Sequence, residues 1–496
     1  MAEKTASSDQ QQLHVFFFPF MSPGHQIPML DMARLFAKRG IKTTIVTTPC
    51  NLSRFQSIID RDRQCVNVEI DLHILKFPSD TVGLPHNCEN LDSLPSRLMS
   101  NSFSRAVMML QPQSDDLVRQ HQPDAIISDL NIPWTAQIAE KYSIPRIVFH
   151  GTSCFSLCVT DSVSKYKPYE GVSNDWMPFL VPGLPDRIHI TMSQMPGRFF
   201  RNLGLQEFFM QFVEAERNTY GVVANTFYEI EPKYIEHYKK IIGKKIWAVG
   251  PVSLCNEKDM DMAERGNKAS IDKDQCLTWL DSKEPNSVIY VCFGGLCAFA
   301  ESQLVEIGLG LEAANYSFIW VIRDGFGDGL AVEDLEDRVK GRGLIIRGWA
   351  PQLLILNHPA VGGFISHCGW NSVLEAVSSG VPMITWPLFG EQFYNATFVA
   401  KQLGIGFGIG VYTGLKWGEE EQAGALVKRY RVAAVVSRLM GDRGSVKEMR
   451  ERASRLRQMA RSAMNEDGSS NGNLDLLIED LSTLKKERLA KGDEVS

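Results

Sequence analysis

One stretch of the sequence, residues 349–392, constrains the fold more than any other. Its letters are WAPQLLILNHPAVGGFISHCGWNSVLEAVSSGVPMITWPLFGEQ. An apolar run at 360–365 leads into a polar turn at 367–372, a helical pattern follows and ends at Gly380, and a second apolar run covers 383–386. Strand, turn, helix and strand in this order form one βαβ unit, which predicts a parallel sheet covered by helices.

The turn of this βαβ unit carries polar side chains that suit an anionic ligand. Backbone N–H groups and a helix N-terminus meet at the carboxyl end of the strand, where negative charge is favoured. His367, Asn371 and Ser372 can donate hydrogen bonds to a phosphate. Glu375 follows Asn371 by one helical turn and can accept hydrogen bonds from sugar hydroxyls. The turn is therefore a candidate site for a ligand with phosphate and sugar parts.

The same alternation of apolar runs and helical patterns extends through both halves of the chain. With 496 residues, the chain is too long for one ordinary domain. A helix is predicted at 27–38, after a turn at 21–26, and a largely helical tail at 422–484. Strands are predicted at 14–20, 41–47, 66–75, 124–129, 146–149, 218–226, 288–293, 318–322, 344–346, 361–365 and 383–386.

The domain division follows from a charged segment between the two halves. It is poor in apolar residues, as expected of an interdomain linker, and we place the linker at 254–273. The first domain then covers 1–253 and the second 274–470, and residues 471–496 form a C-terminal helix. Two doubly wound α/β domains of this kind leave a cleft between the carboxyl edges of their sheets.

Composition excludes several other classes of protein. The net charge of −6 gives no reason to expect nucleic acid or an anionic membrane as a partner. Ten scattered Cys without a CxxC pair do not form a disulfide framework or a zinc site. The polar N-terminus, 1–12, is expected to be disordered, and the short apolar run at 15–21 contains Pro19, so we expect neither a signal peptide nor a membrane span.

These observations predict a cytoplasmic protein with free thiols, without integral membrane association. We also expect it to act as a monomer. Asn395 begins an N-x-T triplet, which is a chance match in a cytoplasmic protein.

Two polar residues of the first domain can form a catalytic pair. His25 and Asp129 each follow a predicted strand of the same sheet, so they can approach each other at its carboxyl edge. An imidazole oriented by a carboxylate is a general-base arrangement. The nearby helix N-terminus would lower the pKa of His25 and Asp129 would raise it, and we expect the carboxylate to dominate. Spacing alone leaves open whether the two are a catalytic pair or two ordinary polar residues.

The stretch 349–392 closely resembles the signature of plant family 1 UDP-sugar glycosyltransferases, from its opening Trp-Ala-Pro-Gln to its closing Glu-Gln. The resemblance extends over most of the chain. It implies the GT-B fold, in which two Rossmann-like domains face each other across a cleft and the last helix crosses back to the first domain.

The resemblance also implies a role for each residue of the donor site. Trp349 would stack on uracil beside Ala350 and Gln352, and Glu375 would hold the ribose. The pyrophosphate would be contacted by His367, Asn371 and Ser372, and the sugar would be faced by Trp370, Glu391 and Gln392.

The catalytic residues follow from two further matches to the family. Residues 19–28 resemble the family's His-containing loop, with His25 as the general base. Residues 127–129 resemble its Asp-containing strand end, with Asp129 as the supporting acid. The implied reaction is one displacement at the anomeric carbon, in which UDP leaves and the anomeric configuration inverts.

Three Asp-x-Asp motifs raise the question of a metal, because many glycosyltransferases hold one with this spacing. We expect such matches by chance, and all three lie in charged stretches that we interpret as surface. The leaving UDP can instead be stabilised by the helix N-terminus with His367, Asn371 and Ser372. We therefore predict no metal and no cofactor. The motifs are Asp60 and Asp62, Asp259 and Asp261, and Asp272 and Asp274.

One residue departs from the family pattern. Gly295, in Phe293-Gly294-Gly295-Leu296, stands where the family usually has Ser. The hydroxyl of that Ser is a phosphate contact in this interpretation, so its absence predicts weaker binding of the donor.

The donor and acceptor are less constrained. A closing Gln is usual for glucose in this family, so the resemblance implies UDP-glucose through Gln392, with UDP-galactose or UDP-glucuronic acid as alternatives. The chain resembles the group acting on triterpenoids, steroids and flavonoids. We place the acceptor pocket at Phe20, Met21, 91–103 and 175–200, although these residues could equally be ordinary core.

Two further functions compete with a glycosyltransferase. A nucleotide-sugar-binding protein without transfer activity would not need both His25 and Asp129. A nicotinamide oxidoreductase would need a GxGxxG fingerprint, which the first predicted βαβ unit lacks.

Overall fold

The computed structural model describes residues 12–66, 68–196, 204–323, 330–414, 418, 420–442 and 444–493. Most of the polar N-terminal segment, and residues 197–200 of the predicted acceptor pocket, lie outside the described residues.

The first domain is built on a seven-stranded parallel sheet in the order β3-β2-β1-β4-β5-β8-β9. Its inner strands are almost wholly buried, because helices cover both faces of a parallel sheet, and this explains their continuous apolar sequences. The strands are β1 (His14–Phe18), β2 (Lys42–Thr47), β3 (Ile70–Ile74), β4 (Ala125–Asp129), β5 (Arg146–His150), β8 (Gly221–Ala224) and β9 (Lys245–Ala248).

The second domain repeats this design with a six-stranded parallel sheet in the order β12-β11-β10-β13-β14-β15. Two parallel α/β sheets confirm the prediction of two Rossmann-like domains. The strands are β10 (Val288–Cys292), β11 (Ser317–Ile322), β12 (Gly343–Arg347), β13 (Val361–Ser366), β14 (Met383–Thr385) and β15 (Gly406–Gly408).

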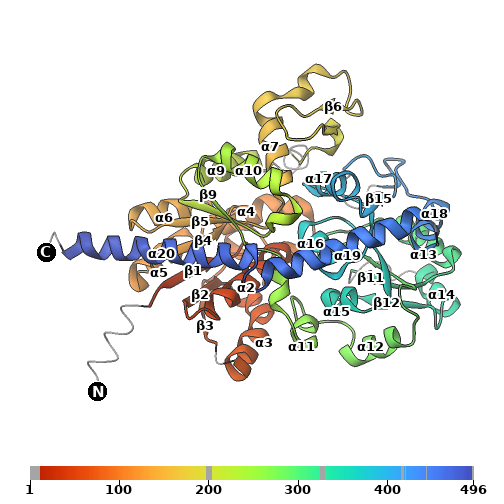
Figure 1. Ribbon diagram of the computed structural model, residues 1–496, viewed down its shortest axis with the longest axis horizontal. Coiled ribbons are helices and arrows are strands. Elements are labelled where there is room, and N and C mark those ends of the chain that lie inside the picture. Colours follow the sequence, from red (N-terminus) through yellow and green to blue (C-terminus); the bar gives the residue numbers. More distant parts are fainter. Residues whose placement is uncertain are drawn as a thin grey trace.

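Helices cover both sheets, and a separate antiparallel pair, β6 (Phe179–Leu180) and β7 (His189–Ile190), lies in a lobe at the top of Figure 1. In the first domain the helices are α2 (Pro23–Ala37), α3 (Pro49–Val66), α4 (Ser100–Met108), α5 (Gln111–His121), α6 (Thr135–Lys141), α7 (Cys154–Tyr166), α9 (Gln206–Arg217) and α10 (Pro232–Ile242). Those that follow are α11 (Asp259–Ala263), α12 (Lys273–Asp281), α13 (Glu301–Ala314), α14 (Leu330–Arg338), α15 (Gln352–Asn357), α16 (Trp370–Ser379), α17 (Gln392–Thr397), α18 (Arg429–Met440), α19 (Gly444–Met464) and α20 (Ser469–Asp493).

The first helix begins earlier than the sequence predicted. We placed its start at Ile27, but α2 begins at Pro23, after Ser22 in an extended conformation. Proline is well suited to the first helical position, where its missing N–H would have no intrahelical partner. His25 consequently lies within the first turn of α2 rather than before it.

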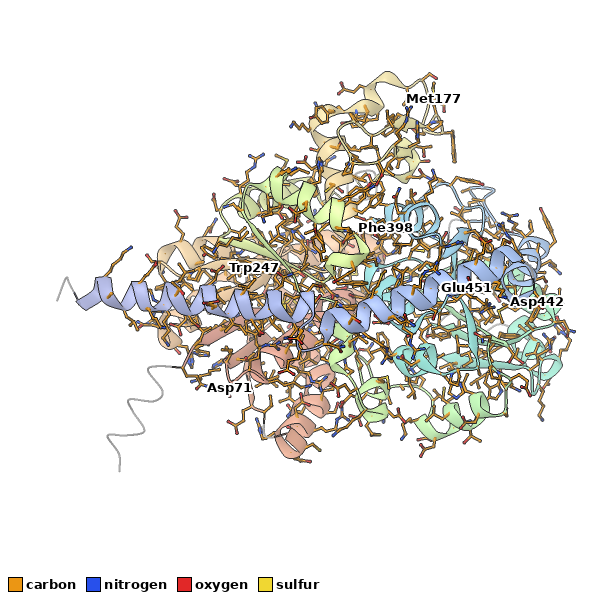
Figure 2. The ribbon with its side chains drawn as sticks, in the orientation of Figure 1. Asp71, Met177, Trp247, Phe398, Asp442 and Glu451 are labelled. Carbon is orange, nitrogen blue, oxygen red and sulfur yellow. The ribbon has the colours of Figure 1, made fainter. Side chains whose placement is uncertain are left out.

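The last helix lies against the first domain. Figure 1 shows α19 and α20 running across both halves of the molecule, with α20 beside the first sheet. Leu474, Leu477 and Leu481 of α20 are buried in one apolar cluster with Trp247, which Figure 2 labels beside this helix. Ion pairs from Lys485 and Arg488 to Asp124 fasten its far end.

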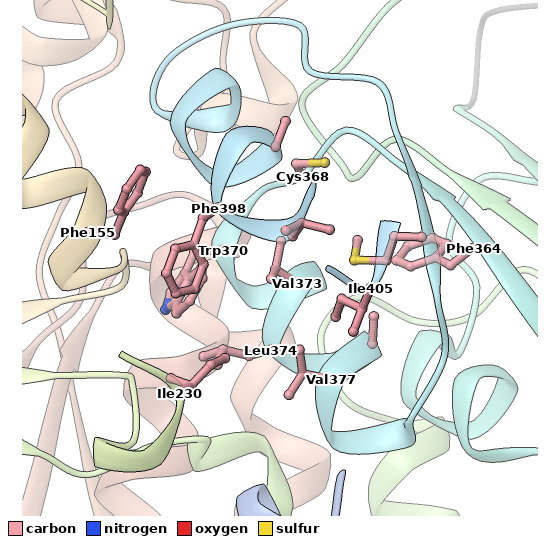
Figure 3. Close-up of a cluster of buried hydrophobic side chains, with 14 of the residues drawn as sticks. Phe155, Ile230, Phe364, Cys368, Trp370, Val373, Leu374, Val377, Phe398 and Ile405 are labelled. Carbon is pink, nitrogen blue, oxygen red and sulfur yellow. The ribbon is translucent and has the colours of Figure 1, made fainter. Parts of the chain in front are cut away.

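A continuous apolar core joins the two domains. Figure 3 shows Phe155 and Ile230 of the first domain packed with Trp370 and Phe398 of the second. Because burial of apolar area is the main stabilising term in folding, this shared core holds the two sheets at a defined separation.

The segment 254–273 lies between the last strand of the first sheet and the first strand of the second, and it is not an open chain. It contains α11, and Asp261 and Arg265 are both buried. No helix within the described residues has the length and apolarity needed to span a bilayer.

The surface interpretation of the Asp-x-Asp motifs is wrong for two of their residues. Asp62 accepts two hydrogen bonds from Arg34, at 2.5 and 2.9 Å, and Asp261 pairs with Arg61 at 2.9 Å. The sequence alone could not reveal this burial, because Asp62 and Asp261 pair with arginines about 30 and 200 positions away. Each buried carboxylate has an arginine beside it, because a buried charge needs an opposite charge.

Candidate active site

A cavity of about 750 Å³ lies between the carboxyl edges of the two sheets. Its lining includes all of the predicted site residues. From the first domain these are His25 and Asp129, and from the second Trp349, Ala350, Gln352, His367, Trp370, Asn371, Ser372, Glu375, Glu391 and Gln392.

His25 and Asp129 form a hydrogen-bonded pair at the first-domain wall. Nδ1 of His25 lies 2.7 Å from Oδ2 of Asp129. Asp129 ends β4 and is almost fully buried, and its Oδ1 accepts a hydrogen bond from the backbone N–H of Asn131 at 2.9 Å. The His25 side chain keeps 35% of its surface exposed, so its other ring nitrogen is available to a ligand in the cavity. This geometry suits a base whose tautomer is fixed by a carboxylate.

The electrostatics of His25 also suit a base. Burial by itself would lower its pKa, but Asp129, through its charge and hydrogen bond, and Glu391, through its charge, raise the pKa above the ordinary value of 6.5. The carboxylate therefore outweighs the opposing effects, in the direction expected from the sequence.

His367, the first residue after β13, has the opposite environment. A Cβ on Gly294 or on Gly369 would lie 2.8 or 2.5 Å from its ring, so only glycines allow the ring to sit between them. Burial lowers its pKa to about 4, and its Nδ1 is buried without a hydrogen-bond partner among the described residues. A neutral imidazole with an unpartnered nitrogen can donate a hydrogen bond to a phosphate oxygen.

The turn after His367 is held in a strained conformation. Cys368 has φ +65°, a region that residues other than glycine seldom adopt. Its backbone N–H donates to Oγ of Ser366 at 3.1 Å, and its carbonyl accepts from Nδ2 of Asn395 at 3.0 Å. Oδ1 of Asn395 in turn accepts from Ser156 of α7 at 2.8 Å. A first-domain helix thereby supports the turn that presents His367.

Trp370 and Asn371 are both engaged at the domain interface. The Trp370 indole N–H donates to the carbonyl of Asn225 at 2.7 Å, and Nδ2 of Asn371 donates to the carbonyl of Gly24 at 2.6 Å. That carbonyl is available because Pro28, four residues later in α2, has no N–H to bond with it. Their predicted contacts with sugar and pyrophosphate stay predictions.

The predicted nucleotide residues are close together. Nε2 of Gln352 donates to Oε2 of Glu375 at 2.6 Å and to Oγ of Ser372 at 3.1 Å. The ring of Trp349 abuts Gly295, where an added Cβ would lie 3.3 Å from it. Trp349 and Glu375 thus line one cavity, as the predicted contacts with uracil and ribose require.

Gln392 and Glu391 lie near the base. Oε1 of Gln392 accepts from the backbone N–H groups of Leu388 and Phe389, at 2.9 and 3.1 Å, which fixes the amide's orientation. Burial raises the pKa of Glu391, and the neighbouring His25 opposes this rise.

The acceptor side of the cavity differs from the prediction. Phe20 and Met21 are buried in the first-domain core and do not line the cavity, although the Phe20 ring packs edge-on against His25 at 5.3 Å. Within the described parts of 91–103 and 175–200, Asp92 and Pro196 line it. The apolar lining comes instead from Leu130, Phe149, Leu157 and Phe209.

Sequence reasoning missed Asn225, Asn395 and Arg265, which all touch residues of the donor side. Asn225 follows β8 directly, a position that could have marked it. No local signal marked Arg265, and Asn395 was interpreted only as a chance triplet.

Comparison with known proteins identifies the family. The family model described as "UDP-glucoronosyl and UDP-glucosyl transferase" matches residues 107–409. The chain belongs to the plant family 1 UDP-glycosyltransferases. This confirms the resemblance seen in the stretch 349–392, and the protein is a glycosyltransferase with the GT-B fold.

Full-length relatives agree with this assignment. The glycosyltransferase is 47% identical over 477 residues to scopoletin glucosyltransferase of Nicotiana tabacum, covering 95% of this chain and 98% of the relative. It is 45% identical over 492 residues to UDP-glycosyltransferase 73C3 of Arabidopsis thaliana, covering 98% and 99%.

A solved structure has the same architecture. It is that of UGT73P12 of Glycyrrhiza uralensis, complexed with glycyrrhetinic acid 3-O-monoglucuronide. It superposes on this glycosyltransferase with a TM-score of 0.90 at 39% identity, covering 97% of this chain and 98% of that one.

Proposed function

We propose that this enzyme transfers glucose from UDP-glucose to a hydroxyl of a lipophilic plant metabolite, a triterpenoid, steroid or flavonoid, with inversion at the anomeric carbon. The observation that carries the proposal is the placement of the His25–Asp129 pair and the His367 turn on opposite walls of one cavity. A base on one side and an anion site on the other are what a direct displacement requires.

The reaction proceeds in one step. The free ring nitrogen of His25 takes the proton of the acceptor hydroxyl, and Asp129 stabilises the imidazolium that forms. The acceptor oxygen forms a bond to the anomeric carbon while the bond from that carbon to the UDP oxygen breaks. The electron pair leaves with UDP, whose negative charge is stabilised by His367 and the N-terminus of α16.

UDP-glucose is our proposed donor because Gln392 stands at the end of the signature stretch, and a relative named as a glucosyltransferase supports this choice. UDP-galactose and UDP-glucuronic acid are the alternatives. The proposal includes independence of metal ions and action as a cytoplasmic monomer. The apolar side chains Leu130, Phe149 and Leu157 support a lipophilic acceptor.

The test is an assay of UDP release with the three UDP-sugars against a panel containing a triterpenoid, a steroid, a flavonoid and scopoletin. We expect UDP release with UDP-glucose, at the same rate in excess chelator. Nuclear magnetic resonance of the product should show that the anomeric configuration has been inverted. Retained configuration or loss of activity in chelator would contradict the mechanism. Binding of UDP without release of UDP from any pair would favour the non-catalytic alternative.

A further inference from the structure

The segment between the domains contributes a buried arginine to the donor side of the cavity. Arg265 lies two residues after α11, is 9% exposed and lines the cavity. Its Nη1 donates to Oε1 of Glu375 at 2.5 Å, and its Nε donates to Oδ2 of Asp31 at 2.8 Å. The guanidinium therefore bridges one carboxylate from each domain.

Both carboxylates are buried, so the bridge is electrostatically strong. Asp31 has no exposed surface, and Glu375 is 3% exposed. A buried carboxylate without an opposite charge is costly, and a charged hydrogen bond in such surroundings is stronger than one in water. Asp31 is also held by Nδ2 of Asn256 at 2.9 Å, so the anchor of Arg265 is itself fixed.

Asp31, the first-domain carboxylate that binds Arg265, lies on the same helix as the proposed base. Asp31 and His25 both belong to α2, six positions apart. Arg265 thus ties the donor-side carboxylate of the second domain to the element that carries the first-domain base.

Glu375 keeps capacity for a ligand despite this bridge. Oε1 accepts from Arg265 and Oε2 accepts from Gln352 at 2.6 Å. Each carboxylate oxygen can accept two hydrogen bonds, so one site on each oxygen is left for a pair of hydroxyl groups. Two fixed donors hold the carboxylate in a single orientation, which lowers the entropy lost when a ligand binds.

Gly266 and Ser270, which follow Arg265 in the chain, support Trp349 in the wall of the cavity. Gly266 has φ +94°, and an added Cβ would lie 2.5 Å from the Trp349 ring. Ser270 holds the Trp349 backbone from both sides, donating to its carbonyl at 2.8 Å and accepting from its N–H at 3.0 Å. The segment 265–270 therefore backs both the predicted uracil residue and the predicted ribose residue.

We infer that Arg265 is a positioning residue for the donor: it fixes the Glu375 carboxylate to receive the two ribose hydroxyls of UDP and couples that carboxylate to α2. The inference rests on the proposed function, since it takes UDP as the nucleotide. Arg265 acts through Glu375, and its loss should therefore be felt only by nucleotides that carry the hydroxyls.

The test compares the binding of UDP and of 2′,3′-dideoxy-UDP by calorimetry in the full-length protein. Wild type should prefer UDP by at least about tenfold, because hydrogen bonds to a charged group are lost without the hydroxyls. In Arg265→Met the ratio of the two dissociation constants should fall to nearly one, while the affinity for the dideoxy nucleotide changes little.

Two further variants separate positioning from folding. Arg265→Lys keeps a positive charge beside the buried carboxylates, so the melting temperature should stay near that of wild type. The single ammonium nitrogen cannot replace both Nε and Nη1 of the arginine, so the preference for UDP over the dideoxy nucleotide should still fall. Arg61→Met is the matched control. Arg61 holds the same segment through Asp261 and Glu264, at 2.9 and 2.5 Å, and among the described residues it has no hydrogen bond to the donor site, so the preference should persist.

The outcomes are distinct. Equal weakening of both nucleotides in Arg265→Met and Arg265→Lys would overturn the inference, because it would reduce Arg265 to a structural link. An undiminished preference in both would overturn it as well. Wild-type protein that binds neither nucleotide would contradict the proposed function itself.

Discussion

His25 and His367 hold similar places in the two domains, each close to the point where a helix begins after a central parallel strand. Their surroundings differ in charge. His25 has a buried carboxylate 2.7 Å from its ring, and its pKa is raised. His367 is packed between glycines, with no carboxylate partner in the part of the chain that the structure describes, and burial lowers its pKa to about 4. The same side chain is thereby suited to take a proton in one domain and to stay neutral as a hydrogen-bond donor in the other.

The comparison teaches that position on a sheet edge brings a residue to the cavity, while its neighbours decide its chemistry. The carboxyl ends of parallel strands are where ligands bind in doubly wound folds, so both histidines reach the site by topology alone. Asp129 at the end of β4 raises the pKa of His25 and so suits it to the role of the proposed base. Gly294 and Gly369 make room for the other.

The largest effect should come from removing the first histidine. His25→Ala should lower kcat by ~10²–10⁴-fold, because the acceptor hydroxyl loses its base. UDP affinity should not change, since His25 lies on the first-domain wall of the cavity and the proposed UDP contacts come from the second domain. Rates of UDP release and calorimetric binding of UDP check the two parts. A variant with wild-type kcat would remove His25 from the mechanism.

Removing the second histidine should give the complementary result. His367→Ala should weaken UDP binding by about tenfold, the cost of one hydrogen bond to a charged group, and should leave the pH dependence of kcat in place. Gly369→Ala is a useful companion variant. It keeps the His367 ring in the protein, but the added Cβ would displace that ring. Unchanged UDP affinity in both variants would contradict the role of His367.

A smaller effect is expected from removing Asn395, which links α7 of the first domain to the turn that carries His367. Asn395→Ala removes the link from α7 to the Cys368 carbonyl and should lower the free energy of unfolding by about 1–3 kcal/mol, as buried groups lose their partners. Urea denaturation measures this loss. Asn395→Asp keeps the acceptor for Ser156 but not the donor to Cys368. A wild-type UDP affinity in both variants would show that the turn keeps its shape without Asn395.

The smallest effect is expected at the position that departs from the family pattern. Gly295→Ser should lower the donor KM by roughly threefold through one added hydrogen bond. The gain is limited because the new Cβ would lie 3.3 Å from the Trp349 ring, which must shift slightly. Initial rates at varied UDP-glucose measure it. A higher KM would mean that crowding of Trp349 outweighs the hydroxyl.

Much of the fold follows from the sequence because buried parallel strands are short apolar runs between recognisable helices. The boundaries of β1, β4 and β13 come within two residues of the predicted ones. The start of α2 was missed because residues 21–26, which include Pro23, were interpreted as a turn, whereas Pro23 occupies the first helical position.

The site was predictable where topology or the signature fixed it, and not where contacts join distant segments. His25, Asp129 and the donor residues line the cavity together. The burial of Asp62 and Asp261, and the bridge from Arg265 to Asp31 and Glu375, depend on partners far away in the chain. No local periodicity encodes such pairs, because each residue alone has the appearance of a solvated charge.

The pH dependence of kcat/KM in wild type and in Asp129→Asn tests the different tuning of the two histidines most directly. A general base must be neutral, so the wild-type rate should rise with pH through a midpoint above 6.5. In Asp129→Asn, burial, the largest influence on the pKa of His25, is opposed by the charge of Glu391 but no longer by Asp129, so the midpoint should move to lower pH and the plateau should fall. An unchanged midpoint and plateau would contradict the account, since Asp129 would then have no effect on the pKa or the activity of His25.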